Sequence, residues 1–224
     1  MSIQGNPFII HDSSLVLSLD AANSKSYVSG SSTWSDLSGN NKTGTLTNGP
    51  TYTSSFGGGI VFDGVDDYAT VSNPLNQSNL SQEWTVNAWF SLSSSPSNNA
   101  QYLVEGLNRG VAADWYTNGP LLYLNDGADD YYTYSNLGSI IGGGIMNLTY
   151  RFKNSGGTRT IYKNSVNATG SGPNNTSTPS GQGANFRIGY AMKGNIYLLQ
   201  IYNRVLSDTE VLQNYNSTKS RFGL

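Results

Sequence analysis

The chain has 224 residues, a net charge of -2, no cysteine and only 12% charged residues. This length suits one large domain. Lysine and arginine form no cluster, so nucleic-acid binding is not expected, because neutralising phosphates needs several cations on one face. Without cysteine there is neither a disulfide framework nor a thiolate metal site. No stretch approaches the roughly 18 apolar residues of a membrane span. The first 14 residues lack a basic segment followed by a long apolar run, so no secretory signal is expected.

Short apolar runs separated by Gly, Asn, Asp, Ser and Pro dominate the sequence and predict β-strands. The first run, Leu15 to Asp20, has leucine at every second position, as a strand with one buried face requires. Further strands are expected at 60–62, 68–71, 84–92, 101–105, 121–125, 131–135, 146–153, 158–163, 186–190 and 194–202. This punctuated spacing predicts an all-β fold, a two-sheet antiparallel sandwich.

One segment near the carboxyl end predicts a helix, over residues 208–216. Ser207 and Glu210 have the spacing of a capping box, and Leu206 and Val211 occupy the flanking apolar positions. Such a short amphipathic helix needs a partner surface, so we expect it to cover one edge or end of the sandwich.

No linker is evident, so the chain is divided into an N-terminal arm, residues 1–12, and a single domain, residues 13–224. The apolar run from Pro7 to Ile10 could dock onto a neighbouring subunit by strand addition. The alternative is that the arm is a terminal strand of the same sandwich.

Residues for catalysis are scarce. Glycoside hydrolysis needs two facing carboxyl groups, and the three glutamates are separated: Glu83 at the start of a predicted strand, Glu105 at the end of another, and Glu210 in the helix cap. His11, the one histidine, lies beside Asp12 in the arm, and neighbours in sequence rarely adopt triad geometry. The sequence therefore predicts a protein that is not an enzyme, with a glycoside hydrolase as a remaining alternative.

Two loops offer the oxygen ligands that Ca²⁺ prefers. The first contains Asp36, Asn40 and Asn41, and the second contains Asp63, Asp66 and the adjacent Asp67. Asp and Asn beside Gly are equally typical of tight turns, so both interpretations stay open.

Aromatic residues concentrate between positions 115 and 134, among amide and carboxylate side chains. Aromatic faces beside such groups suit sugar rings, so this segment is a candidate carbohydrate-binding site, formed by Trp115, Tyr116, Tyr132, Tyr134, Asn125 and Asp129. The alternative is that these rings are core residues and cross-strand pairs, which stabilise any sheet.

Several segments together resemble a known family. They are LVLSLDA at 15–21, WSDLSGNN at 34–41, IVFDGVDDY at 60–68, WTVNAWF at 84–90 and GNIYLLQIYNRVLS at 194–207. In this order they resemble laminin-G-like domains of the concanavalin A-like lectin and glucanase superfamily. The resemblance implies a two-sheet jelly roll. It also implies a structural Ca²⁺ held by Asp36 and the loop to Asn41, although Tyr197 stands where many members have an acidic residue. The catalytic glutamate pair of the glucanases is missing.

Two further runs resemble proteins of tailed bacteriophages of marine and cyanobacterial hosts: GTLTNGPT at 44–51 and the ending NYNSTKSRFGL. This resemblance implies a non-enzymatic virion protein, either a capsid decoration or a tail-associated component. Its expected partners are other capsid or tail proteins, glycans and further copies of the chain. The alternative is a stand-alone carbohydrate-binding module.

Overall fold

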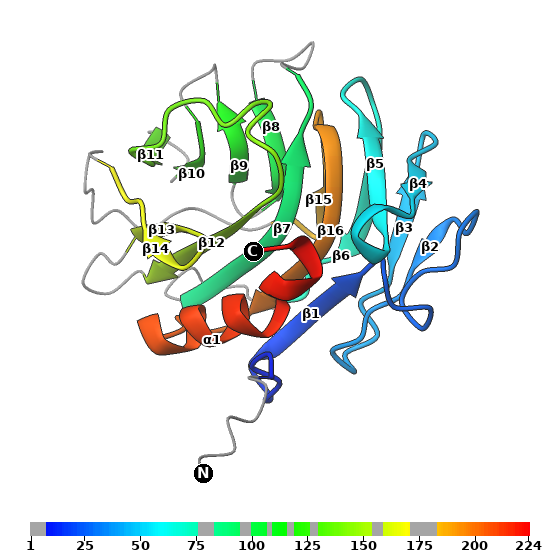
Figure 1. Cartoon of the computed structure of the whole chain (residues 1–224), viewed down its shortest axis with the longest axis horizontal. Coiled ribbons are helices and arrows are strands. Elements are labelled where there is room, and N and C mark those ends of the chain that lie inside the picture. Colours follow the sequence, from blue (N-terminus) through cyan, green and yellow to red (C-terminus); the bar gives the residue numbers. More distant parts are fainter. Residues whose placement is uncertain are drawn as a thin grey trace.

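The computed structural model describes residues 8–75, 83–94, 100–106, 109–115, 119–125, 130–153, 159–170 and 183–224. Two antiparallel sheets pack face to face, and one short helix follows the last strand (Figure 1). The predicted fold class, an all-β jelly-roll sandwich, is confirmed.

The first sheet, called sheet A, has the strand order β14-β13-β12-β7-β16-β5-β4, and β1 pairs with β16 beside this path. Its strands are β1 (Leu15–Asp20), β4 (Thr51–Thr53), β5 (Gly59–Asp63), β7 (Glu83–Leu92), β12 (Met146–Lys153), β13 (Arg159–Lys163), β14 (Val166–Asn167) and β16 (Lys193–Tyr202).

The second sheet, called sheet B, has the order β11-β10-β9-β8-β15-β6-β3-β2. Its strands are β2 (Thr33–Trp34), β3 (Gly44–Thr47), β6 (Tyr68–Ser72), β8 (Ala100–Glu105), β9 (Arg109–Trp115), β10 (Leu121–Asn125), β11 (Asp130–Tyr134) and β15 (Asn185–Ile188).

The main core lies between the two sheets and follows the two-residue period of the strands. In β7, Val86, Ala88 and Phe90 point into it and are completely buried. The alternate residues of β7 occupy the outer face of sheet A. Three of them, Thr85, Asn87 and Trp89, are also buried, where the carboxyl-terminal segment covers that face: α1 (Asp208–Thr218) followed by the 3₁₀ turn η2 (Lys219–Phe222) (Figure 1).

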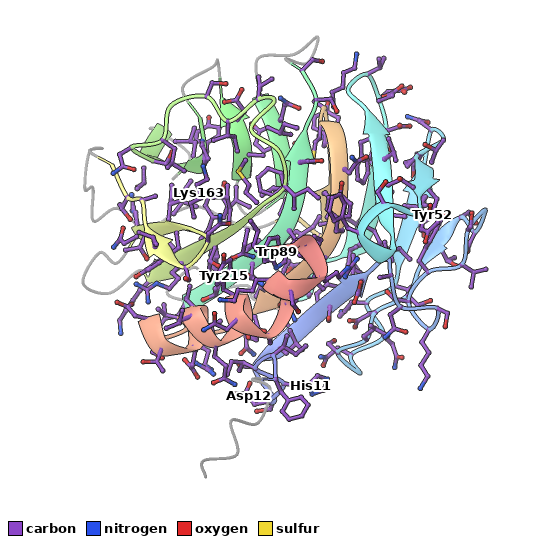
Figure 2. The ribbon with its side chains drawn as sticks, viewed as in Figure 1. His11, Asp12, Tyr52, Trp89, Lys163 and Tyr215 are labelled. Carbon is purple, nitrogen blue, oxygen red and sulfur yellow. The ribbon has the colours of Figure 1, made fainter. Side chains whose placement is uncertain are left out.

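The covering segment is fastened by aromatic stacking. The Trp89 ring stacks on Phe222, with centroids 4.1 Å apart, and on Tyr215 at 5.7 Å. The Trp89 indole also donates a hydrogen bond of 2.8 Å to the hydroxyl of Thr218. Figure 2 shows Trp89 of β7 and Tyr215 of α1 close to each other where the helix lies against sheet A. The helix was expected to cover an edge or end of the sandwich. It packs instead on the outer face of sheet A, because Trp89 of the inner strand β7 is the residue on which the aromatic side chains of α1 and η2 stack.

The start of α1 has the predicted capping box, with the Glu210 amide donating to the Ser207 hydroxyl and the Ser207 amide donating to the Glu210 carboxylate. Arg204 pairs with both carboxylate oxygens of Glu210 and with Asp12. The Arg204 guanidinium and the capping bonds lower the pKa of Glu210 to about 2.

The described part of the arm, residues 8–12, contains no strand and runs along α1. Its backbone is held by side chains: the Ile10 amide donates to Asn214, the Tyr202 hydroxyl donates to the Ile10 carbonyl, and Gln213 donates to the Phe8 carbonyl. In the described part of the chain, no helix has the length and hydropathy needed to cross a membrane.

Candidate functional site

The outer face of sheet B carries partly exposed tyrosine rings beside a charged pair. Direct antiparallel partners share a face, so the register defines a row of positions across the sheet. Its members in strand order are Thr45, Thr70, Arg187, Glu105, Gly110, Tyr123 and Tyr132. Arg187 and Glu105 stand at the middle of this row.

Beside this pair lies a group of tyrosines that we call the tyrosine platform: Tyr68, Tyr102 and Tyr190. Tyr190 is in contact with both others, with ring centroids 6.2 Å from Tyr68 and 6.4 Å from Tyr102. The Arg187 guanidinium carbon lies 3.6 Å from the centre of the Tyr190 ring. Glu105 accepts two hydrogen bonds from Arg187, each of 2.6 Å. All five side chains are partly exposed.

The turn after β15 places Tyr190 on this face. Gly189 has φ +74, and a Cβ at this position would lie 2.5 Å from the Phe62 ring, so glycine allows the turn to close tightly on the core. The Tyr190 carbonyl then accepts a hydrogen bond from the Tyr102 amide. This bond fixes Tyr190 next to Tyr102 on the neighbouring strand.

The platform has the chemistry of a carbohydrate-binding surface. Partly exposed ring faces can stack against the C–H faces of a sugar, while a carboxylate offers free lone pairs to sugar hydroxyls. Tyr68 and Tyr102 lie on sheet strands, and the backbone hydrogen bond to Tyr102 holds Tyr190, so little side-chain entropy is lost when a ligand binds. Prediction from sequence missed this site, because its members are far apart in the chain and only the register of β6, β8 and β15 unites them.

The predicted sugar site at 115–134 falls largely outside the described part of the structure. Tyr116 and Asp129 are not among the described residues. Trp115, Asn125, Tyr132 and Tyr134 lie on described strands, but their side chains do not belong to that part. The backbone register pairs Tyr132 with Tyr123 and Tyr134 with Leu121, on β10 and β11 at one edge of sheet B, whereas Tyr102 lies on β8 near its middle. This site stays a prediction.

The first predicted calcium loop is closed by its own hydrogen bonds. The Asp36 carboxylate accepts four, from the backbone amides of Ser18, Ser38 and Lys42 and from the hydroxyl of Ser38. Asn40 donates to the Leu15 carbonyl, and Asn41 adopts a left-handed backbone conformation with φ 56. These contacts give the loop residues a structural role, and the Ca²⁺ prediction here stays a prediction.

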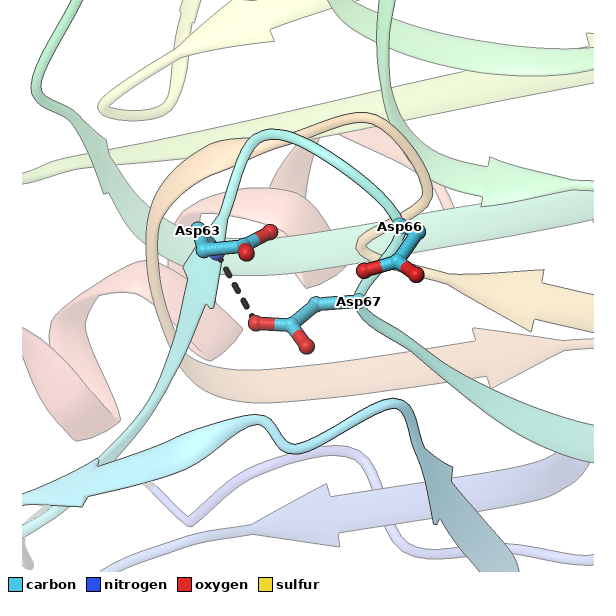
Figure 3. Close-up of side chains that lie close together, drawn as sticks. All are labelled: Asp63, Asp66 and Asp67. Atoms are coloured by element: carbon cyan, nitrogen blue, oxygen red, sulfur yellow. Dashed lines mark hydrogen bonds between the residues drawn. The ribbon is translucent and has the colours of Figure 1, made fainter.

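The second loop brings three carboxylates together at the turn between β5 and β6 (Figure 3). Carboxylate oxygens of Asp63, Asp66 and Asp67 lie within 4.8 Å of one another. Asp67 is buried and accepts a hydrogen bond of 3.0 Å from the Asp63 amide. Burial, together with the negative charges of Asp63 and Asp66, raises the pKa of Asp67 despite this hydrogen bond. The turn leads directly into Tyr68 of the platform.

The three glutamates occupy three separate places, each in an ion pair. Glu83 pairs with Lys153 on sheet A, Glu105 with Arg187 on sheet B, and Glu210 with Arg204 at the start of α1. His11 is exposed and lies beside Asp12 at the start of the described chain (Figure 2). The Asp12 carboxylate accepts hydrogen bonds from Ser14 and Arg204.

A laminin G-like sequence profile, described as the concanavalin A-like lectin/glucanases superfamily, matches residues 63–212. The chain belongs to this superfamily. The match extends from the last residue of β5 into α1 and therefore includes the whole tyrosine platform. A search of curated proteins gives no significant match.

Solved structures with the same fold include binding domains and parts of enzymes. Domain 4 of AbnA, an extracellular arabinanase from Geobacillus stearothermophilus solved with arabinotriose, gives a TM-score of 0.68 at 19% identity, covering 90% of this chain and 98% of that one. The binding domain of Paraclostridial Mosquitocidal Protein 1 gives 0.66 at 18% identity, covering 91% of this chain and 52% of that one. Trypanosoma rangeli sialidase gives a TM-score of 0.65 at 17% identity, covering 94% of this chain and 34% of that one.

The chain thus spans about half of the mosquitocidal-protein binding domain and about a third of the sialidase, whereas it matches the arabinanase domain almost end to end. At these identities the likeness shows the fold alone, a lectin-like sandwich.

Proposed function

We propose that the protein is a non-enzymatic glycan-binding domain and that the tyrosine platform on sheet B is its binding surface. The observation that carries the proposal is a group of three partly exposed tyrosine rings, two of which contact the guanidinium of an arginine–glutamate pair on the same sheet face. Support comes from the arabinanase domain solved with arabinotriose, which has the same fold over nearly its whole length.

The positions of the glutamates favour binding over hydrolysis. A glycosidase needs one carboxyl group to donate a proton and a second to act as base or nucleophile across the same bond. Glu105 is the glutamate on the platform, and both of its oxygens bind Arg187. Glu83 and Glu210 belong to sheet A and to α1, so neither is the second group.

The test is glycan-array screening followed by calorimetric titration of the best glycan, with arabinotriose titrated in parallel. Tyr190→Ala should weaken binding at least tenfold, about 1.4 kcal/mol. The matched control is Tyr52→Ala, which removes a partly exposed tyrosine from β4 in sheet A (Figure 2). Equal loss in both variants, or no binding of any glycan to the wild type, would refute the proposal.

We further propose that this domain is a virion component of a tailed bacteriophage, on the capsid or tail, with glycans and other virion proteins as partners. Support comes from the sequence resemblance at 44–51 and 214–224. Particle mass spectrometry tests it. Deleting residues 1–12 should remove the protein from particles while the domain still folds, and an unchanged copy number would rule out docking through the arm.

A third proposal concerns Ca²⁺, which we assign to the turn of Asp63, Asp66 and Asp67, because hard cations take carboxylate oxygens and would relieve the repulsion among these three. A ligand that binds only the native state raises its stability. Added Ca²⁺ should therefore raise the Tm of the wild type but not of Asp66→Asn, and identical curves with calcium and with chelator would contradict the assignment.

A further inference from the structure

The charge of Arg187, beside the tyrosine platform, is neutralised by Glu105. Arg187 and Glu105 are direct cross-strand partners on β15 and β8. The Arg187 Nε donates to one Glu105 oxygen and Nη2 to the other, each over 2.6 Å. In such a bidentate pair the guanidinium edge that would best recognise a carboxylate already holds one.

The flat face of the same guanidinium is also occupied. The guanidinium carbon lies 3.6 Å from the centre of the Tyr190 ring and 5.7 Å from that of Tyr68. Arginine thereby acts as a spacer that holds two tyrosines at fixed positions, rather than as a free cation. The pair presents no net charge to an incoming ligand.

We infer that the platform selects neutral glycans over glycans that carry carboxylates, such as uronates and sialates. The inference rests on the proposed function and adds the substrate class. An acidic sugar would have to displace Glu105 from Arg187 and approach a carboxylate of like charge. A neutral sugar needs only the faces of the tyrosine rings and the remaining lone pairs of Glu105, which can accept hydrogen bonds from sugar hydroxyls.

The test compares galactotriose with trigalacturonate. Each ring of galactotriose carries a hydroxymethyl group where the ring of trigalacturonate carries a carboxylate. The wild type should bind galactotriose at least tenfold more tightly. Glu105→Gln releases the Arg187 charge and should reduce this preference at least tenfold in low salt. Glu83→Gln removes a carboxylate from a lysine pair on sheet A, so it changes the net charge equally and should leave the preference unchanged.

Arg187→Gln provides the opposite change and an independent test if Glu105→Gln does not fold. It leaves the Glu105 carboxylate unpaired, so the preference for galactotriose should increase. A wild type that prefers trigalacturonate, or a Glu105→Gln variant with the wild-type preference, would overturn the inference while the proposed function stands. Absence of binding to both trisaccharides also overturns it, and the array and arabinotriose titrations then decide whether the proposed function fails as well.

Discussion

The outer faces of the two sheets both carry aromatic residues, but those under the carboxyl-terminal segment on sheet A are buried, whereas those of the tyrosine platform on sheet B are partly exposed. On sheet A, Trp89 and Tyr197 are almost completely buried, because Tyr215 and Phe222 from α1 and η2 pack over them. On sheet B, Tyr68, Tyr102 and Tyr190 are partly exposed around a charged pair. Aromatic content alone therefore does not distinguish a packing surface from a binding surface, and what covers each ring decides.

The polar groups of the two faces differ in the same way. Beneath α1, Asn87, Asn147 and Gln200 are buried and bond to one another. Buried amides find their partners within the protein, and these bonds join β12, β7 and β16 across sheet A. On sheet B, Glu105 bonds to Arg187 and retains lone pairs that a ligand can use.

Trp89→Ala should have the largest effect on stability. The variant loses both ring stacks and the bond to Thr218, so the free energy of unfolding should fall by about 3–5 kcal/mol, as is typical for Phe or Trp to Ala in cores. Urea denaturation measures this. A decrease of less than 1 kcal/mol in the free energy of unfolding would mean that packing of the carboxyl-terminal segment on sheet A contributes little to stability.

Acidification should have an intermediate effect, through the start of α1. The folded pKa of Glu210, about 2, is below its usual value, so its stabilisation is present above the unfolded pKa and is lost as pH falls from about 4.5 to 2. Asp12 and Asp208, with lowered pKa values, act in the same direction, whereas Asp67, with a raised one, opposes it.

The part due to Glu210 should be about 1–2 kcal/mol, the usual size of a helix cap with an ion pair. Arg204→Met removes the cation that holds Glu210 ionised, so stability should depend less steeply on pH. If the free energy of unfolding of variant and wild type falls in parallel between pH 5 and pH 2, Arg204 is not the cause of the lowered pKa of Glu210.

Tyr190→Ala should have the smallest effect on stability, below about 1 kcal/mol, because its ring is partly exposed. The same change should nevertheless remove most glycan affinity. The two outer faces therefore predict opposite effects. Replacing Trp89 should lower stability without a direct effect on glycan binding, and replacing Tyr190 should weaken glycan binding with little effect on stability. Thermal melts and calorimetric titrations of the two variants at one temperature measure both effects.

Most of the fold was predictable from local pattern. The expected strand at 84–92 is β7 at 83–92, and the expected helix at 208–216 is α1 at 208–218, because alternation and the capping box are local signals. Strand β9, Arg109–Trp115, was missed, since Gly110 and the small residues Ala112 and Ala113 give no alternating pattern.

The binding surface was not predictable in the same way. The sequence drew attention to the tyrosines at 131–134, which are neighbours in the chain, whereas Tyr68, Tyr102 and Tyr190 meet only through long-range register. The acidic turn at Asp63 and Asp66 was found in advance, because its members are adjacent, but the burial of Asp67 depends on the packing of the whole sheet.

The most direct test of glycan binding by the tyrosine platform is to map a bound glycan on the tyrosine rings. Protein carrying ¹³C-labelled tyrosine, titrated with the best array glycan and followed by NMR, should show ring shifts at Tyr68, Tyr102 and Tyr190. The rings of Tyr27, Tyr52 and Tyr215 should stay unchanged. Shifts confined to Tyr27, Tyr52 and Tyr215, with no shift at the tyrosine platform, would contradict glycan binding by the platform.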